Sequence, residues 1–226
     1  MSSALRALIG RVPDRCQQEL RRLRFEWQIS HDQFRSPEPE YDAAPTWLRP
    51  GDWAIDVGAN IGHYTVRFAR IVGPSGRVFA FEPVSTTFSL LAANVEWAGL
   101  QNVTLVNAAV LDSTMLARME IPNWAGETIK NLYQAHLSNS GTGALVLCLP
   151  LDSLPIPSRV ALVKIDAEGF DEQVLSGMRH LLDRDKPRLI VEMGAHEVPA
   201  FVRDMGYQEK SLPGSPNVVL THPSRS

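Results

Sequence analysis

A chain of 226 residues, with 44% hydrophobic and 21% charged residues, has the composition of an ordinary globular protein and can bury a core. A net charge of −3 offers no basic surface for nucleic acid, and no apolar run approaches the roughly 20 residues that a membrane span needs. Two cysteines, Cys16 and Cys148, exclude a disulfide framework, so we expect both as buried apolar residues of a cytoplasmic protein.

The N-terminal part of the chain is predicted to be helical and then irregular. Residues 1–35 are rich in arginine, and Leu20, Leu23 and Trp27 recur at helical spacing, which predicts one or two amphipathic helices. Such helices could cap the main domain, gate a substrate site or form a homodimer. Residues 36–51 contain four prolines and a glycine, a composition typical of a linker.

From residue 51 the chain alternates between strand and helix patterns, so we expect an extension over 1–50 and a main domain over 51–226. Repeated strand–helix units imply an α/β fold, with a parallel sheet and helices on both of its faces. The predicted strands are 53–57, 78–81, 103–106, 115–121, 144–149, 160–165, 188–193 and a closing pair within 207–221, and the predicted helices are 62–71, 86–98, 170–182 and 198–205.

A turn rich in acid and glycine follows the first predicted strand, in the sequence IDVGANIGHYT, and predicts a ligand site at the carboxyl end of the sheet. Gly58 lets the backbone turn sharply and approach a ligand. Gly62 opens the next helix, whose free N–H groups can meet a carboxylate. Asp56 could receive an ammonium group, directly or through water. Glu82, at the end of the second strand, could accept both hydroxyls of a ribose.

The spacing of this turn separates two classes of cofactor. A dinucleotide site requires G-x-G-x-x-G, but Asn60 and His63 occupy the second and third glycine positions. A histidine there would obstruct the packing of helix on strand. S-adenosylmethionine has an amine, a carboxylate and a ribose but no pyrophosphate, so D-x-G-x-N-x-G favours it over NAD. An NAD-dependent oxidoreductase and a glycine turn without cofactor are the alternatives.

Three blocks, IDVGANIGHYT, GRVFAFEP and ALVKIDAEGFDEQVLSGM, resemble in order and spacing the FkbM family of S-adenosylmethionine-dependent methyltransferases. The resemblance implies a Rossmann-like class I methyltransferase fold with a mostly parallel, seven-stranded sheet. It also implies that Glu82 holds the ribose. The residues that it assigns to the methionine part are Asp56, Gly58, Asn60 and Gly62.

The same resemblance suggests the acceptor. The family commonly methylates oxygen on sugars and polyketide-type natural products, so we expect a small-molecule acceptor. Methylation of nitrogen or carboxyl groups of a peptide, and a non-catalytic binding protein, are the alternatives. Asn107 follows the third strand, where many class I methyltransferases contact adenine, and it could bind adenine or only cap the strand. A polar loop with Trp124, Asn131, Tyr133 and His136 suits a sugar-like acceptor, although an ordinary hairpin would have the same composition.

Residues for the chemistry follow the later strands. A sulfonium methyl is already electrophilic, so the protein must align the acceptor and remove its proton. Asp166 is the first candidate for the base or for orienting the acceptor. Lys164, on the same side of the strand, could orient it, unless the two form only a structural pair. His196 has an ordinary pKa that suits a base near neutrality, although most loop histidines are surface residues.

An oxygen-ligand metal site is the remaining alternative for this region. Asp166, Glu168, Glu192 and His196 could bind a divalent cation that acidifies a hydroxyl. Glu168 could instead cap the following helix. Because the spacing is no specific metal signature, we expect no metal.

Overall fold

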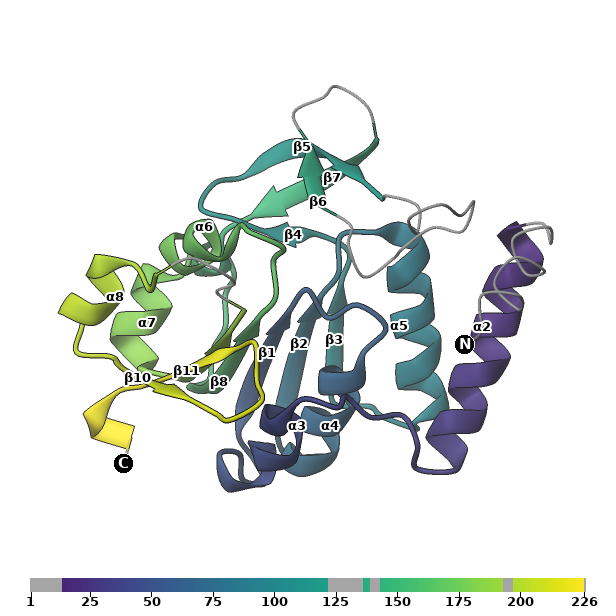
Figure 1. The fold of residues 1–226 in the computed structure, drawn as a ribbon, viewed down its shortest axis with the longest axis horizontal. Helices are drawn as coiled ribbons and strands as arrows, with labels where there is room; N and C mark the ends of the chain where they lie inside the picture. The colour runs from purple at the N-terminus through teal and green to yellow at the C-terminus, as the bar shows by residue number, and fades with distance from the viewer. Residues whose placement is uncertain (1–13, 122–135, 139–142, 193–196, 226) are drawn as a thin grey trace.

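A computed structural model describes residues 14–121, 136–138, 143–192 and 197–225. Seven strands form the main sheet, in the order β10-β11-β9-β8-β1-β2-β3 (Figure 1). β11 runs antiparallel to both of its neighbours, β9 and β10, and all other neighbouring pairs are parallel. The mostly parallel, seven-stranded sheet expected from the sequence is therefore confirmed. Its strands are β1 (Trp53–Val57), β2 (Arg77–Phe81), β3 (Val103–Val106), β8 (Val160–Ile165), β9 (Arg188–Val191), β10 (Gln208–Ser211) and β11 (Val218–Thr221).

Both faces of this sheet are covered, because alternate residues of the central strands point to opposite sides. Ala54, Val78 and Leu162 pack with α4 (His63–Val72). Ile55, Val163 and Leu189 pack on the other face with three short helices. These helices are α6 (Asp171–Ser176), α7 (Arg179–Asp185) and α8 (Ala200–Asp204). None of the described helices is long and apolar enough to cross a bilayer.

The helix predicted over 170–182 is divided into α6 and α7. Gly177 lies at the break, and a Cβ there would stand 2.0 Å from the carbonyl oxygen of Leu111. The chain at residue 111 thus passes so close to this helix that only glycine fits. Glycine also has a low helix propensity, so the helix breaks at the residue where the close chain leaves room only for glycine.

A second sheet of four strands lies across the carboxyl ends of the parallel strands (Figure 1). The two strands predicted there are confirmed as β5 (Met115–Glu120) and β7 (Ala144–Leu149). Two short strands, β4 (Ala109–Val110) and β6 (His136–Ser138), were not predicted. Asn123, Trp124, Asn131 and Tyr133 of the predicted polar loop lie outside the described residues.

The N-terminal helix α2 (Asp14–Ser30) lies along α5 (Ser85–Trp97), as Figure 1 shows. The helical period was predicted correctly, but the wrong face was expected to be buried. Leu20, Leu23 and Trp27 are 50–61% exposed. Phe25 and Ile29 are buried instead, in a cluster with Phe34, Ile61, Val66 and Leu90. Contact with α5 and α4 decides which face of the helix is covered, and the helical period does not show it.

The segment expected to be a linker, residues 36–51, is a packed part of the molecule. It contains α3 (Pro39–Ala43) and the 3₁₀ helix η1 (Ala44–Thr46), each with a proline in its first turn. Proline suits that position because its fixed φ matches the helix and its missing N–H is not needed there. Tyr41, Ala44 and Leu48 are buried against α4 and the sheet.

The two cysteines have different environments. Cys148 is buried within the second sheet, as expected, but Cys16 is exposed on α2. The prediction for Cys16 was wrong, because the face of α2 that carries it points away from α5. Both thiols are free.

Candidate active site

A cavity of about 240 Å³ opens at the carboxyl ends of β1, β2, β8 and β9. It lies beside the point where the strand order reverses, because β1 is flanked by β2 on one side and β8 on the other. Ligands of open α/β sheets bind at such switch points. The residues that line the cavity are Glu38, Val57, Gly58, Asn60, Glu82, Pro83, Val84, Ala108, Ala109, Val110, Leu111, Met119, Asp166, Ala167, Glu168, Phe170 and Glu192.

The glycine turn presses β1 against the end of β8. Gly58 has a φ of +70°, and a Cβ there would lie 1.9 Å from the carbonyl oxygen of Asp166. The backbone N–H of Asp166 donates to the carbonyl of Val57 at 3.1 Å. Gly58 therefore allows the turn and the strand end of Asp166 to meet at the cavity wall.

Asn60 and Gly62 complete the turn in different ways. Asn60 has a φ of +50°, which asparagine tolerates better than most residues, and it lines the cavity. Gly62 has a φ of +97° and begins α4, where a Cβ would lie 2.6 Å from Cδ1 of Leu91. Gly62 is not among the lining residues; it lets α4 pack closely on α5.

Glu82 projects into the cavity from the end of β2. One of its carboxylate oxygens accepts the backbone N–H of Asn60 at 3.0 Å, and the other accepts that of Val84 at 2.8 Å. Burial raises the pKa of Glu82 to about 7, although these two N–H groups act in the opposite direction. The carboxyl group is thereby fixed in place and titrates near neutral pH.

Asp56 lies behind the turn rather than in the cavity. It is 1% exposed, and the hydroxyl of Thr65 donates to its Oδ2 at 2.5 Å. Its Oδ1 has no hydrogen-bond partner among the described residues. Burial raises the pKa of Asp56 to about 6, against the effect of the nearby Lys164 ammonium. This position differs from the one expected for direct contact with an ammonium group.

Lys164 and Asp166 form an ion pair at the end of β8, with 2.8 Å between Nζ and Oδ2. Lys164 is 4% exposed, and its Nζ lies 4.9 Å from the ring centroid of Tyr64. Burial by itself would lower the pKa of Lys164, but the carboxylates of Asp166 and Asp56 raise it overall. Lys164 therefore stays charged behind the cavity wall, while Asp166 lines the cavity.

Glu192, at the end of β9, joins this pair. Its side chain and that of Asp166 are hydrogen-bonded, which raises the pKa of Glu192 to about 8, and burial adds to the effect. Burial also acts to raise the pKa of Asp166, but Lys164 and the hydrogen bond from Glu192 lower it overall. The two carboxyl groups thus hold one proton near neutral pH, with the negative charge on Asp166.

Of the other predicted residues, Glu168 lines the cavity, Asn107 does not, and His196 lies outside the described chain. The amide of Asn107 donates to the carbonyls of Glu82 (2.8 Å) and Pro83 (3.1 Å), so it ties the ends of β2 and β3 together. Residues 108–111, not Asn107, line the cavity. At the start of α6, Asp171 accepts the backbone N–H of Ala167. His196 lies outside the described residues, so its role stays a prediction.

The alternative of a metal site gains no support from the part of the chain that the structure describes. No group of three or more histidine, cysteine, aspartate or glutamate side chains there is arranged to hold a metal ion. His196, one of the four ligands considered, lies outside the described residues.

Two site residues were not recognised as such from the sequence. Glu192 was expected at the strand end next to that of Asp166 and was offered as a metal ligand, but its pairing with Asp166 across β8 and β9 was not predicted. Glu38 lines the cavity from the N-terminal segment, where the hydroxyl of Tyr64 donates to its Oε2 at 2.6 Å. The prolines around Glu38 had suggested a linker, and no periodic pattern marks it as a site residue.

Comparison with known proteins adds the family. Residues 56–209 match the family model described as the methyltransferase FkbM domain. The chain belongs to the FkbM family of S-adenosylmethionine-dependent methyltransferases. It is 29% identical over 197 residues to the 31-O-demethyl-FK506 methyltransferase FkbM of Streptomyces tacrolimicus, covering 71% of this chain and 74% of that protein. It is 31% identical over 161 residues to Methyltransferase 1 of Beauveria bassiana, covering 61% and 62%.

Solved structures agree on the fold. The FkbM methyltransferase of Methylobacillus flagellatus aligns with a TM-score of 0.59 at 16% identity, over 82% of this chain, which spans 48% of that protein. A methyltransferase of Geobacter sulfurreducens aligns with a TM-score of 0.50 at 15% identity, over 98% of this chain and 96% of that one. The expected Rossmann-like class I methyltransferase fold is confirmed.

Proposed function

We propose that this FkbM family protein transfers a methyl group from S-adenosylmethionine to a hydroxyl oxygen of a sugar or natural product. The observation that carries the proposal is the position of Asp166. Its charged carboxylate lines the same cavity as Glu82 and the glycine turn. The name of the Streptomyces tacrolimicus relative, a 31-O-demethyl-FK506 methyltransferase, supports oxygen as the methylated atom.

The charge of the cavity fits this cofactor better than a dinucleotide. Among the described residues no lysine or arginine lines the cavity. A cavity wall with carboxyl groups and no basic side chain attracts a cofactor that carries a sulfonium and an ammonium group, whereas it would repel a pyrophosphate. The carboxyl groups that line the cavity are those of Glu38, Glu82, Asp166, Glu168 and Glu192.

The residues that line the cavity also match the separate parts of the cofactor. Glu82 presents two carboxylate oxygens for the ribose hydroxyls. Val84, Leu111 and Phe170 offer an apolar lining suited to the adenine ring. The turn at Gly58 and Asn60 would hold the methionine part.

S-adenosylmethionine supplies an electrophilic methyl group. Asp166, kept charged by Lys164, would accept a hydrogen bond from the acceptor hydroxyl and then its proton. Lys164 holds the Asp166 carboxylate through Oδ2 at the wall of the cavity that would hold the acceptor. Glu192 keeps its own proton near neutral pH and steadies Asp166 from the neighbouring strand.

Calorimetry and methyl incorporation test this proposal. We expect the protein to bind S-adenosylhomocysteine and not NAD. With methyl-labelled cofactor and a panel of hydroxylated sugars and polyketides, including 31-O-demethyl-FK506, label should appear on oxygen. Asp166→Asn should lower kcat by about 100-fold or more while S-adenosylhomocysteine affinity is retained. Binding of NAD alone, or label on nitrogen, would contradict the proposal.

A further inference from the structure

We propose that Glu38, which lies on the N-terminal segment outside the glycine turn, receives the ammonium group of the methionine part of S-adenosylmethionine. This inference rests on the proposed function. It assigns to the N-terminal segment a binding role that the sequence pattern had assigned to Asp56.

The first observation is where Glu38 lies and how it is held. It lines the same cavity as Gly58 and Asn60. Its Oε2 accepts hydrogen bonds from the hydroxyl of Tyr64 at 2.6 Å and from that of Ser36 at 3.1 Å. Tyr64 belongs to the first turn of α4, directly after the glycine turn. Both donors reach the same oxygen, so Oε1 is left for a ligand.

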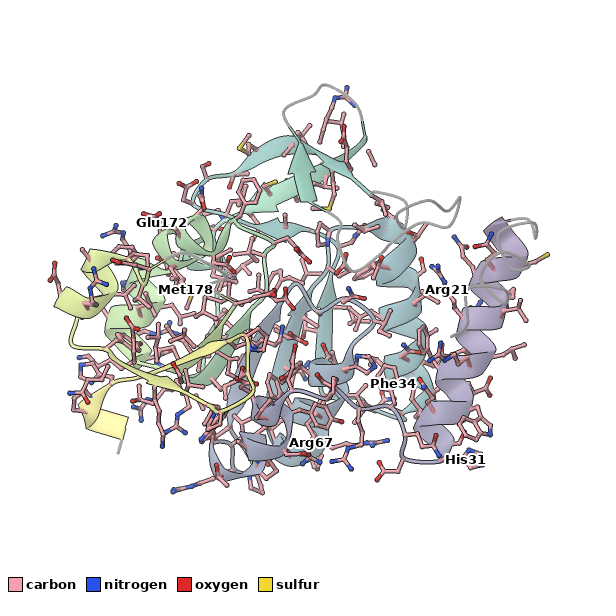
Figure 2. All side chains as sticks on the ribbon, in the orientation of Figure 1. Arg21, His31, Phe34, Arg67, Glu172 and Met178 are labelled. Carbon is pink, nitrogen blue, oxygen red and sulfur yellow. The ribbon has the colours of Figure 1, made fainter. Side chains whose placement is uncertain are left out.

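The second observation is that the segment around Glu38 is firmly attached. Glu40 is fully buried and accepts a hydrogen bond from the hydroxyl of Ser215. The hydroxyl of Tyr41 donates to the carbonyl of Phe34 at 3.2 Å, and Nε of Arg67 donates to the carbonyl of Tyr41 at 3.3 Å. Phe34 and Arg67 are both labelled in Figure 2, on the lower side where this segment crosses α4. A residue held by such a frame binds without a large ordering cost.

The third observation is the balance of charge at this end of the cavity. Lys164 is close enough to Asp166, Asp56 and Glu38 for all three carboxyl groups to act on its pKa. One ammonium group thus faces three acids, which leaves an excess of negative charge. Because the pKa of Asp56 is about 6, this excess is smaller near pH 6. A second ammonium group, from a ligand, would reduce this excess of negative charge.

The fourth observation is that the other acids of the cavity have competing roles. Asp166 already pairs with Lys164 and Glu192, and Glu82 accepts two backbone N–H groups. Glu168 is exposed, where an ion pair contributes little. Asp56 is behind the turn. Glu38, in contrast, accepts hydrogen bonds from the hydroxyls of Tyr64 and Ser36 and forms no ion pair among the described residues, so it is the best placed of these acids to receive a cation.

A comparison of two ligands tests this assignment. S-adenosylhomocysteine carries the ammonium group, whereas 5′-methylthioadenosine has the same nucleoside and sulfur without the amino-acid end. In calorimetry, Glu38→Gln should weaken S-adenosylhomocysteine binding by about 10- to 100-fold, the range for loss of a hydrogen bond to a charged group. Binding of 5′-methylthioadenosine should be unchanged. Glu82→Ala, as the matched control, should weaken both ligands.

Two further results decide between binding and packing. Tyr64→Phe removes a donor to Glu38 but keeps its charge, so it should weaken S-adenosylhomocysteine binding less than Glu38→Gln does. Equal affinity of wild type and Glu38→Gln for S-adenosylhomocysteine, or an equal loss for both ligands, would overturn the role of Glu38. A wild-type protein that binds neither ligand would instead overturn the proposed function.

Discussion

At the scale of single residues, three neighbouring side chains are kept in different protonation states by their surroundings. Lys164 stays charged although it is buried, because two carboxylates act on it. Asp166 stays ionised beside it, and Glu192 retains a proton up to a pKa of about 8. An ionised carboxylate is thereby placed in the cavity where we propose that the acceptor hydroxyl binds.

Glu82 makes a pH prediction possible at the same scale. Its ionised form is the one that can accept both ribose hydroxyls, and its pKa is about 7. The fraction ionised grows about tenfold between pH 6 and pH 8, so S-adenosylhomocysteine affinity should rise by about that factor. Calorimetry across this range measures it. Glu82→Gln should bind weakly with little pH dependence, and a wild-type affinity that falls with pH would contradict the role.

The ionisation of Glu82 also affects the stability of the fold, which should fall as the pH rises, whereas cofactor affinity should increase. Glu82 binds its proton more tightly in the folded chain than in the unfolded one, since burial raises its pKa. Stability from this group is therefore present at acidic pH and is lost as pH rises through about 7. The carboxyls of Asp166 and Asp56, which also face Glu82, add to the increase in its pKa.

At the scale of elements, the contact between the glycine turn and β8 joins the two halves of the site. Gly58→Ala should destabilise the protein in urea unfolding more than Gly99→Ala does. Both glycines have a φ near +70°, where alanine costs about 1–2 kcal/mol, but only at Gly58 would the Cβ meet backbone, at 1.9 Å. We expect about 1–3 kcal/mol beyond the Gly99 control.

Equal destabilisation of these two variants would contradict this account. It would mean that the contact between Gly58 and the carbonyl of Asp166 relaxes freely. Gly99 is a suitable control because a Cβ there would have no atom within 4 Å.

The elements of the main sheet were predictable because their patterns are local. The strand at 160–165 has all six residues buried, and its apolar run shows this directly. The N-terminal segment was harder to interpret. Its helix was found from its period, but the burial of Phe25 and Ile29 in place of Leu20 and Leu23 depends on which neighbouring helix is available.

At the scale of the whole molecule, cofactor binding should stabilise the fold. A ligand at 100 times its Kd adds about 2.7 kcal/mol, which for a chain of this size raises Tm by roughly 5–10 °C. Thermal unfolding with S-adenosylhomocysteine should show this shift, and NAD should give none. A shift with NAD alone would favour the oxidoreductase alternative. The homodimer and the cytoplasmic location stay predictions.

Much of the candidate site was visible in the sequence, since Gly58, Asn60, Glu82 and Asp166 all line one cavity. Gly58, Glu82 and Asp166 were predicted because each directly follows a strand, and Asn60 because it lies in the turn that Gly58 begins; parallel strands end at one edge of a sheet. Asp56 was expected among them, but strand alternation turns its side chain toward α4 and Thr65. Glu38 was not expected, since it comes from a segment without a repeating pattern.

The sequence by itself determined the strands and most helices of the main sheet, the acid and glycine turn, and the carboxylates at the strand ends, because these depend on neighbours a few residues apart. Only the tertiary structure decided that Glu38 reaches the cavity, that Glu192 shares a proton with Asp166, and that Asp56 lies behind the turn. Each of these depends on contacts between residues distant in the chain. Such contacts follow from how whole elements pack, and no local pattern encodes them.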